Sequence, residues 1–149
     1  MGALPGTTGR RRIYLMRHGF VDYTSPEVRA AQDPSIAYLT ETGRAEARAA
    51  GVALSEVPLD VAFHTGLRRT QETAQIVLSE HELEAPELER EQRFQELRSG
   101  QYIDFKSAEH LAATMTFQFE QAGTPGATFL DGGEKFSDAM ERIEDGMKG

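Results

Sequence analysis

The hydrophobic residues of this chain fall into short continuous runs separated by longer stretches with helical spacing. Residues 13–16 are all apolar, which is typical of a strand buried on both faces. The pattern also predicts strands over 59–64 and 87–89, helices over 40–54, 67–79 and 104–121, a final helix after Gly132 and Gly133, and a helical turn near 27–31 inside a long loop at 20–38. This alternation predicts an α/β fold, a three-layer sandwich with helices on both faces of a mostly parallel sheet.

Each long helix carries a set of small or apolar residues that we expect to face the sheet. These residues are Ala45, Ala49, Val52 and Ala53 in the first helix, Leu67, Ala74, Val77 and Leu78 in the second, and Phe136, Met140, Ile143 and Met147 in the last.

The composition is that of an ordinary globular domain. We expect a single domain over residues 10–149, preceded by a flexible N-terminus at residues 1–9. The net charge of −8 disfavours nucleic acid and membrane surfaces as partners, and no run of residues has the length of a membrane span. Cysteine is absent and the four histidines lack metal-binding spacing, so no disulfide, metal or other cofactor is predicted. We expect a cytoplasmic protein, and no particular oligomeric state is indicated.

Candidate chemistry begins where the first predicted strand ends. Arg17, His18 and Gly19 follow the apolar run directly, and ligands of open α/β sheets lie just beyond the carboxyl ends of the strands. A neutral imidazole can act as a nucleophile, a guanidinium can grip phosphate through two hydrogen bonds, and a glycine lets an anion approach the backbone. The alternative is an ordinary strand followed by a polar loop.

Two arginines, Arg68 and Arg69, open the helix predicted over residues 67–79. Cations oppose the dipole at a helix N-terminus, so this pair indicates a bound anion that the helix end and a guanidinium would both attract. The alternative is that one arginine points to solvent, and we expect this of Arg68. A local basic pocket in an acidic chain suits a small anionic substrate.

Taken together, these stretches resemble the motifs of the histidine phosphatase superfamily, the phosphoglycerate-mutase-like proteins. Arg17, His18 and Gly19 match its defining tripeptide. Further matches, in family order, are residues 39–43 with Ala47, residues 63–74 with Arg69, Thr73 and Ala74, the set Glu96, Gly100 and Tyr102, and the set Gly132, Gly133, Glu134, Phe136, Asp138 and Arg142. Glu46 and Glu72 depart from the pattern, since glutamine is usual at both positions.

The resemblance implies a phosphomonoester hydrolase that needs no metal. His18 is the expected nucleophile and would carry a phosphohistidine, while a backbone carbonyl holds its other ring nitrogen. Arg17 and Arg69 are expected to clamp the phosphate oxygens, and Glu96 to protonate the leaving alkoxide. Thr24 stands where many relatives place a phosphate-contacting asparagine, so we expect it to bind phosphate or, equally, to cap a turn.

Each assignment has a structural alternative. Arg69 would then only pair with Glu72 or Glu82, and Glu96 would be one of the 24 acidic residues on the surface. We expect His64, at the end of the second predicted strand, to pack rather than to act in catalysis.

The family's second histidine has no counterpart in this sequence. Family members carry it on a strand after the glycine-glycine-glutamate helix, whereas His81 and His110 come too early in this chain to replace it. We therefore expect a fragment that lacks roughly 40–60 residues, this C-terminal strand among them, with weak or no turnover by the 149 residues alone. A natural short form is the alternative.

The resemblance leaves three functions open. We favour a phosphatase that acts on a small phosphorylated metabolite. Phosphoglycerate mutases usually follow the tripeptide with glutamate and serine and carry a later asparagine, whereas this chain has Phe20, Val21 and Thr24. The second function is that of a mutase-type phosphotransferase, and the third is that of an impaired protein that only binds phosphate.

Overall fold

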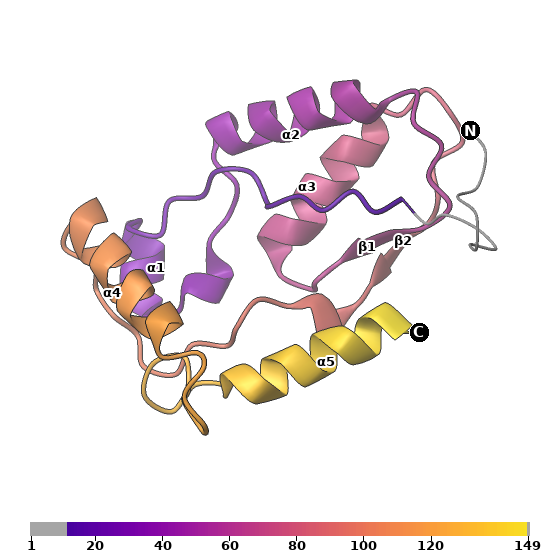
Figure 1. The fold of residues 1–149 in the computed structure, drawn as a ribbon. Coiled ribbons are helices and arrows are strands. Elements are labelled where there is room, and N and C mark those ends of the chain that lie inside the picture. The colour runs from indigo at the N-terminus through magenta and orange to yellow at the C-terminus, as the bar shows by residue number, and fades with distance from the viewer. Residues whose placement is uncertain (1–11, 149) are drawn as a thin grey trace.

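The computed structural model describes residues 12–148, which form an α/β fold with a small parallel sheet (Figure 1). The flexible N-terminus predicted for residues 1–9 lies outside the described residues. The strands are β1 (Ala62–His64) and β2 (Leu88–Arg90); the helices are α1 (Pro26–Ala31), α2 (Glu41–Leu54), α3 (Arg68–Ser79), α4 (Ala108–Glu120) and α5 (Phe136–Lys148), with short 3₁₀ helices η1 (Pro34–Ile36) and η2 (Gln92–Phe94). In Figure 1, α2 and α3 lie on one side of the strands and α5 lies on the other, which matches the predicted layers.

The β1–α3–β2 unit brings the start of α3 to the carboxyl end of β1. The two strands pair in parallel, with Ala62 opposite Leu88 and His64 opposite Arg90. The chain turns between β1 and α3 at Gly66, whose φ of 94° favours glycine. Arginines at the first turn of α3 therefore lie where parallel sheets place their ligand sites.

The apolar run at residues 13–16 does not form the buried strand that its composition predicts. The segment makes no strand hydrogen bonds, and its side chains are exposed, Leu15 to 95%. A strand is buried on both faces only when neighbouring strands and helices enclose it. Within residues 12–148 the sheet contains only β1 and β2, and this segment pairs with neither.

Helix α2 turns a different face inward from the one its alanines predict. The residues expected to be buried, Ala45, Ala49, Val52 and Ala53, are exposed. The buried residues are instead Gly43, Ala47 and Gly51, spaced one turn apart. A Cβ on Gly43 would lie 2.2 Å from the carbonyl oxygen of Phe20, and one on Gly51 would lie 2.9 Å from that of Val77 in α3. Close backbone approach, rather than apolar surface, selects the buried face of this helix.

Helix α5 also departs from its predicted stripe. Phe136 and Ala139 are buried, whereas Met140 and Met147 are more than half exposed. The ring of Phe136 packs edge-on against Phe129 in the preceding loop, with centroids 6.2 Å apart. The burial of α5 is therefore concentrated near its first turn instead of running along its length.

Residues 20–38 form a compact unit with its own core rather than an open loop. An antiparallel bridge joins Val21 to Leu39, and these two residues pack with Val28 and Ala37 in one buried cluster. The predicted helical turn is present as α1. Tyr23 packs against this cluster, so its position is set by the core. No helix in the described part of the chain is long and apolar enough to cross a membrane.

We predict that Gly43→Ala destabilises the chain, although alanine is the better helix former. The new methyl group would meet backbone atoms of Phe20 and Gly19 that cannot rotate away, and overpacking of this kind costs about 1–3 kcal/mol. Urea unfolding would measure the loss.

Gly123→Ala is the matched control, because a Cβ there meets no atom within 4 Å. Equal stability of the Gly43→Ala variant and this control would show that the contact between α2 and residues 19–20 is not tight.

Candidate active site

Three hydrogen bonds fix the backbone just after His18. The amide of Gly19 donates to the Thr73 hydroxyl of α3 at 3.1 Å, and the amide of Phe20 donates to the Glu46 carboxylate of α2 at 2.8 Å. The Phe20 carbonyl accepts from the Thr40 amide at 3.0 Å. Both helices therefore hold the segment that carries the candidate nucleophile.

The imidazole of His18 is held in one tautomer. Its Nδ1 lies 2.8 Å from the Gly19 carbonyl oxygen. Because a carbonyl can only accept, Nδ1 must carry the proton, and Nε2 of the neutral ring keeps a free electron pair. The Tyr23 hydroxyl lies 3.2 Å from Nε2 and donates to it. The backbone-carbonyl contact that the resemblance implies is thus present.

The charges around His18 favour its neutral form. Burial lowers the pKa of His18 below its ordinary value of 6.5, and the positive charges of Arg69 and Arg17 lower it further. The hydrogen bond to Gly19 and the charge of Glu96 act in the opposite direction. Since the net shift is downward, the ring is neutral at neutral pH, as a nucleophile requires.

Arg69 is almost fully buried, with 2% of its surface exposed. Its Nη1 donates to the carbonyl oxygens of Pro34 and Ser35 at 3.2 and 3.4 Å, and its Nη2 pairs with the Glu96 carboxylate. The buried Nε has no hydrogen-bond partner among the described residues. A buried guanidinium with a spare donor beside a neutral imidazole suits an anionic ligand.

The placement of Arg69 follows from the buried face of α3. Arg69, Thr73 and Val77 are buried at intervals of four residues. The apolar face predicted for this helix is only partly correct, because Val77 alone of its four members is fully buried. The remaining inward positions carry the arginine and the threonine that serve the site.

Arg17, the residue before His18, lies near the same side chains as Arg69. Its side chain is exposed, yet its charge acts on His18 and on the hydroxyl of Tyr23. Two guanidiniums, an imidazole and a phenol therefore meet at one place.

Glu96 reaches this place through its pairing with Arg69, although its side chain is 58% exposed. Arg142 of α5 holds the loop that carries Glu96. Arg142 donates to the carbonyl oxygens of Glu96 at 3.2 Å and of Arg93 at 2.7 Å. Its guanidinium also forms two hydrogen bonds, of 2.7 and 2.8 Å, with the carboxylate of Glu134.

The Glu134 carboxylate completes this clamp on the Glu96 loop. It pairs with Arg142 and accepts from the amide and side chain of Arg98, at 3.2 and 3.1 Å. The Arg142 guanidinium, followed by the Arg98 contacts, lowers the pKa of Glu134 to about 2 despite burial. Glu134 therefore stays ionised at neutral pH and fixes the backbone on both sides of Glu96.

Thr24, Arg68 and His64 do not gather at the nucleophile in the same way. The amide and hydroxyl of Thr24 both donate to the Asp22 carboxylate, at 2.8 and 2.7 Å, which is the turn-capping alternative. Arg68 is exposed as predicted and stacks over Tyr38, 4.4 Å from the ring centroid. His64 is buried, and its Nδ1 accepts from the Gly66 amide at 3.2 Å.

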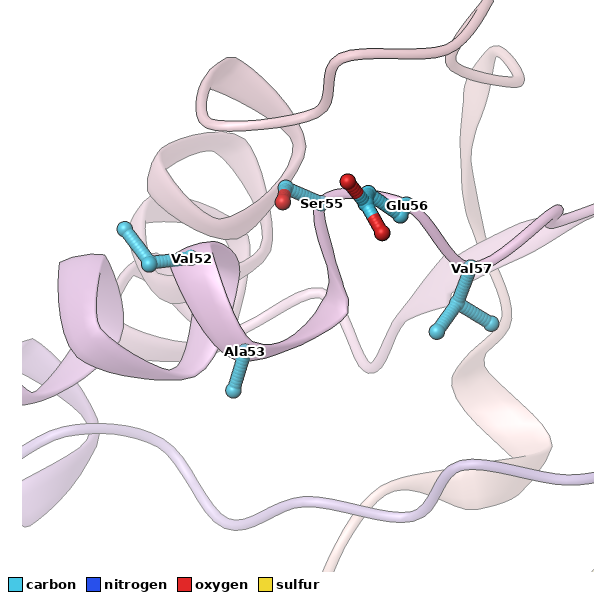
Figure 2. A pocket seen from close by; sticks show the side chains of 5 residues that line it. All are labelled: Val52, Ala53, Ser55, Glu56 and Val57. Carbon is cyan, nitrogen blue, oxygen red and sulfur yellow. The ribbon is translucent and has the colours of Figure 1, made fainter.

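Two hollows on the surface differ in what lines them. One of about 100 Å³ adjoins Arg17 and His18. The other, of about 500 Å³, lies at the C-terminal end of α2 (Figure 2), and its lining residues are Val52, Ala53, Ser55, Glu56 and Val57. Figure 2 shows Val52 and Ala53 pointing away from each other, and Ser55 and Glu56 are the polar residues that line this larger hollow. The smaller hollow adjoins His18, but Arg69, Tyr23 and Glu96 do not line it, so the contacts of His18 and Arg69 define the candidate site.

Comparison with known proteins identifies the family of this chain. The family model of the histidine phosphatase superfamily (branch 1) matches residues 13–149. The chain belongs to the histidine phosphatase superfamily. Superfamily membership confirms the resemblance that the sequence motifs indicate, and the α/β fold agrees with it.

Individual proteins resemble this chain in sequence or in structure. It is 40% identical over 75 residues to a 2,3-bisphosphoglycerate-dependent phosphoglycerate mutase of Bartonella henselae, a stretch that covers 48% of this chain and 35% of the mutase. One similar solved structure is Bacillus stearothermophilus YhfR, with 22% identity, a TM-score of 0.58, and a match that covers 89% of this chain and 63% of that one. Mycobacterial hydrolase 1 has 21% identity, a TM-score of 0.62, and a match over 88% of this chain and 60% of that one. A mycobacterial glucosyl-3-phosphoglycerate phosphatase in complex with inorganic phosphate has 21% identity, a TM-score of 0.61, and a match over 88% of this chain and 58% of that one. The chain thus spans 58–63% of the length of these three structures, which show the shared fold.

The two glutamates that depart from the superfamily pattern have contacts that account for them. Glu46 accepts from the Phe20 amide, a role that a glutamine oxygen could also fill. Glu72 pairs with Arg44 of α2 at 2.6 Å, which ties α3 to α2. Sequence reasoning missed Tyr23; the one available signal was a large aromatic residue in a long loop just after the histidine motif.

We predict that the pKa of His18, followed by NMR titration of its ring protons, lies below 6.5 and rises in Arg17→Gln. The substitution removes a positive charge that disfavours the protonated ring. Activity that depends on neutral His18 should therefore persist to a lower pH in the unmodified chain than in the variant.

Arg48→Gln is the matched control, since it removes an exposed arginine from α2. A His18 titration at or above 6.5 in the unmodified chain, or an equal rise in both variants, would contradict this electrostatic description.

Proposed function

We propose that the protein is a phosphomonoester hydrolase that acts through a phosphohistidine on His18. The observation that carries the proposal is the tautomer of this residue: Nδ1 carries the proton and is held by the Gly19 carbonyl, so Nε2 is the ring nitrogen whose electron pair can form a bond to phosphorus. Arg69 and Arg17 lie close enough for their charges to act on the same ring.

The proposed reaction has two phosphoryl transfers. In the first, the Nε2 electron pair forms a bond to phosphorus as the ester P–O bond breaks, and Glu96 gives its proton to the leaving alkoxide. In the second, water attacks the phosphorus, its proton passes to Glu96, and the N–P bond breaks to release inorganic phosphate. Arg17 and Arg69 would stabilise the negative charge on the non-bridging oxygens, so the proposal includes no metal.

Phosphate binding would also prepare Glu96 for its role. Glu96 pairs with Arg69. A bound phosphate would compete for the Arg69 guanidinium and release Glu96, whose carboxyl group could then reach the leaving oxygen.

The substrate class that we propose is a small phosphorylated metabolite. One neighbour in fold is titled a glucosyl-3-phosphoglycerate phosphatase, whereas the 40% identical stretch belongs to a phosphoglycerate mutase. Phe20, Val21 and Thr24 replace the residues usual in mutases, which favours hydrolysis. Interconversion of 2- and 3-phosphoglycerate in a coupled assay would favour the mutase instead.

We predict that the chain releases little or no nitrophenolate from p-nitrophenyl phosphate, and that His18→Ala abolishes the release that occurs, because the loss of a nucleophile lowers a rate at least about a thousandfold. Quenched reactions should contain acid-labile phosphate on His18. We expect slow turnover by these 149 residues, because the second histidine that the family carries is not among them, so trapped phosphohistidine is the more sensitive readout.

His110→Ala in α4 is the control and should keep the activity of the unmodified chain. Nitrophenolate release that is unaffected by His18→Ala would overturn the proposed function. Phosphate binding without any trapped phosphohistidine would indicate an impaired protein that only binds phosphate.

A further inference from the structure

The Tyr23 hydroxyl is hydrogen-bonded to Nε2 of His18, the atom that the proposed reaction uses. The hydroxyl donates at 3.2 Å, and the two rings meet edge-on with centroids 6.4 Å apart. A nitrogen that accepts a hydrogen bond has its electron pair engaged, so it cannot attack phosphorus until the hydroxyl moves. The present arrangement is therefore a resting state of the nucleophile.

The surroundings of Tyr23 explain why its hydroxyl is a donor in this state. Burial raises the pKa of Tyr23 above its ordinary value of 10, so the hydroxyl keeps its proton at neutral pH. The ring packs against the core of residues 20–38, and the Arg69 guanidinium carbon lies 5.6 Å from the ring centroid. The ring is thus held in place, and the hydroxyl needs only a small movement to change its partner.

A phosphoryl group bound between the two arginines would offer that partner. Arg17 acts on the Tyr23 hydroxyl, and Arg69 lies over its ring, so an anion held by both would lie within reach of the phenol. A hydrogen bond from a hydroxyl to a charged oxygen is roughly twice as strong as one between neutral groups. The Tyr23 hydroxyl therefore gains a stronger hydrogen bond when its acceptor changes from Nε2 of His18 to a phosphate oxygen.

We propose that Tyr23 is a positioning residue that holds the Nε2 electron pair of His18 through its hydroxyl and passes this hydrogen bond to the phosphoryl group when substrate binds. The inference rests on the proposed function for its second half, whereas its first half concerns only the contact between Tyr23 and His18. Substrate binding then frees Nε2 of His18 and gives the phosphoryl group a hydrogen-bond donor, the Tyr23 hydroxyl.

The test is Tyr23→Phe, which removes the hydroxyl and keeps the ring. Without the donor, diethyl pyrocarbonate should modify His18 about two- to tenfold faster, the factor that one hydrogen bond supplies. The ¹⁵N resonance of Nε2 should move downfield, toward the position of an unbonded imidazole nitrogen. Inorganic phosphate, in contrast, should bind about tenfold more weakly because a donor to its oxygens is lost.

Tyr38→Phe is the matched control, since it removes the hydroxyl of an exposed tyrosine that bonds to Arg68 instead. It should leave the modification rate, the ¹⁵N resonance and phosphate affinity unchanged. In Tyr23→Phe, His18 should become more reactive and phosphate should bind more weakly, while the circular dichroism spectrum and the unfolding midpoint stay unchanged. A general loosening of the site would change the spectrum or the midpoint as well.

The inference fails if Tyr23→Phe changes neither the reactivity nor the ¹⁵N resonance of His18. It also fails, without any variant, if Nε2 of the unmodified chain already resonates as an unbonded nitrogen. Neither result depends on turnover, so each is distinct from failure of the proposed function, which is read from phosphohistidine. Normal phosphate affinity in Tyr23→Phe would overturn the transfer of the hydrogen bond to the ligand.

Discussion

A guanidinium with 2% exposure must find partners inside the protein, because an unpaired charge is very costly to remove from water. Arg69 finds them in segments far apart along the chain: the carbonyl oxygens of Pro34 and Ser35, the carboxylate of Glu96, and the ring of Tyr23. The site therefore forms around one side chain at the first turn of α3. Its buried Nε still lacks a hydrogen-bond partner among the described residues.

Tight backbone packing gives His18 its position beside this arginine. Gly43 of α2 lets the chain at residues 19–20 approach so closely that no Cβ would fit, and Thr73 of α3 accepts from the Gly19 amide. On the other side of the site, Arg142 and Glu134 hold the loop that carries Glu96. Helices from both layers thus set the relative positions of the imidazole, the guanidinium and the carboxyl group.

The motifs and most helices could be predicted from the sequence because they depend on local residues. Arg17, His18 and Gly19 are contiguous, and α2 begins at a threonine cap that accepts from the Gly43 amide. The buried face of α2 could not be predicted, because it is set by which backbone atoms of other segments approach Gly43 and Gly51. The strand at residues 13–16 was predicted wrongly, since composition cannot supply the neighbouring strands that bury it. Tyr23 was missed for a related reason: its contact with Nε2 depends on the core of residues 20–38.

We propose that Arg69 exchanges Glu96 for a phosphoryl group that His18 attacks. The decisive measurement is a crystal structure with orthovanadate, which mimics the pentacoordinate phosphorus of the transition state. We expect a vanadium bond to Nε2 of His18, with Arg17 and Arg69 on the vanadate oxygens and Glu96 released from Arg69. Vanadate bound away from His18, or an Arg69–Glu96 pair that persists beside bound vanadate, would contradict it.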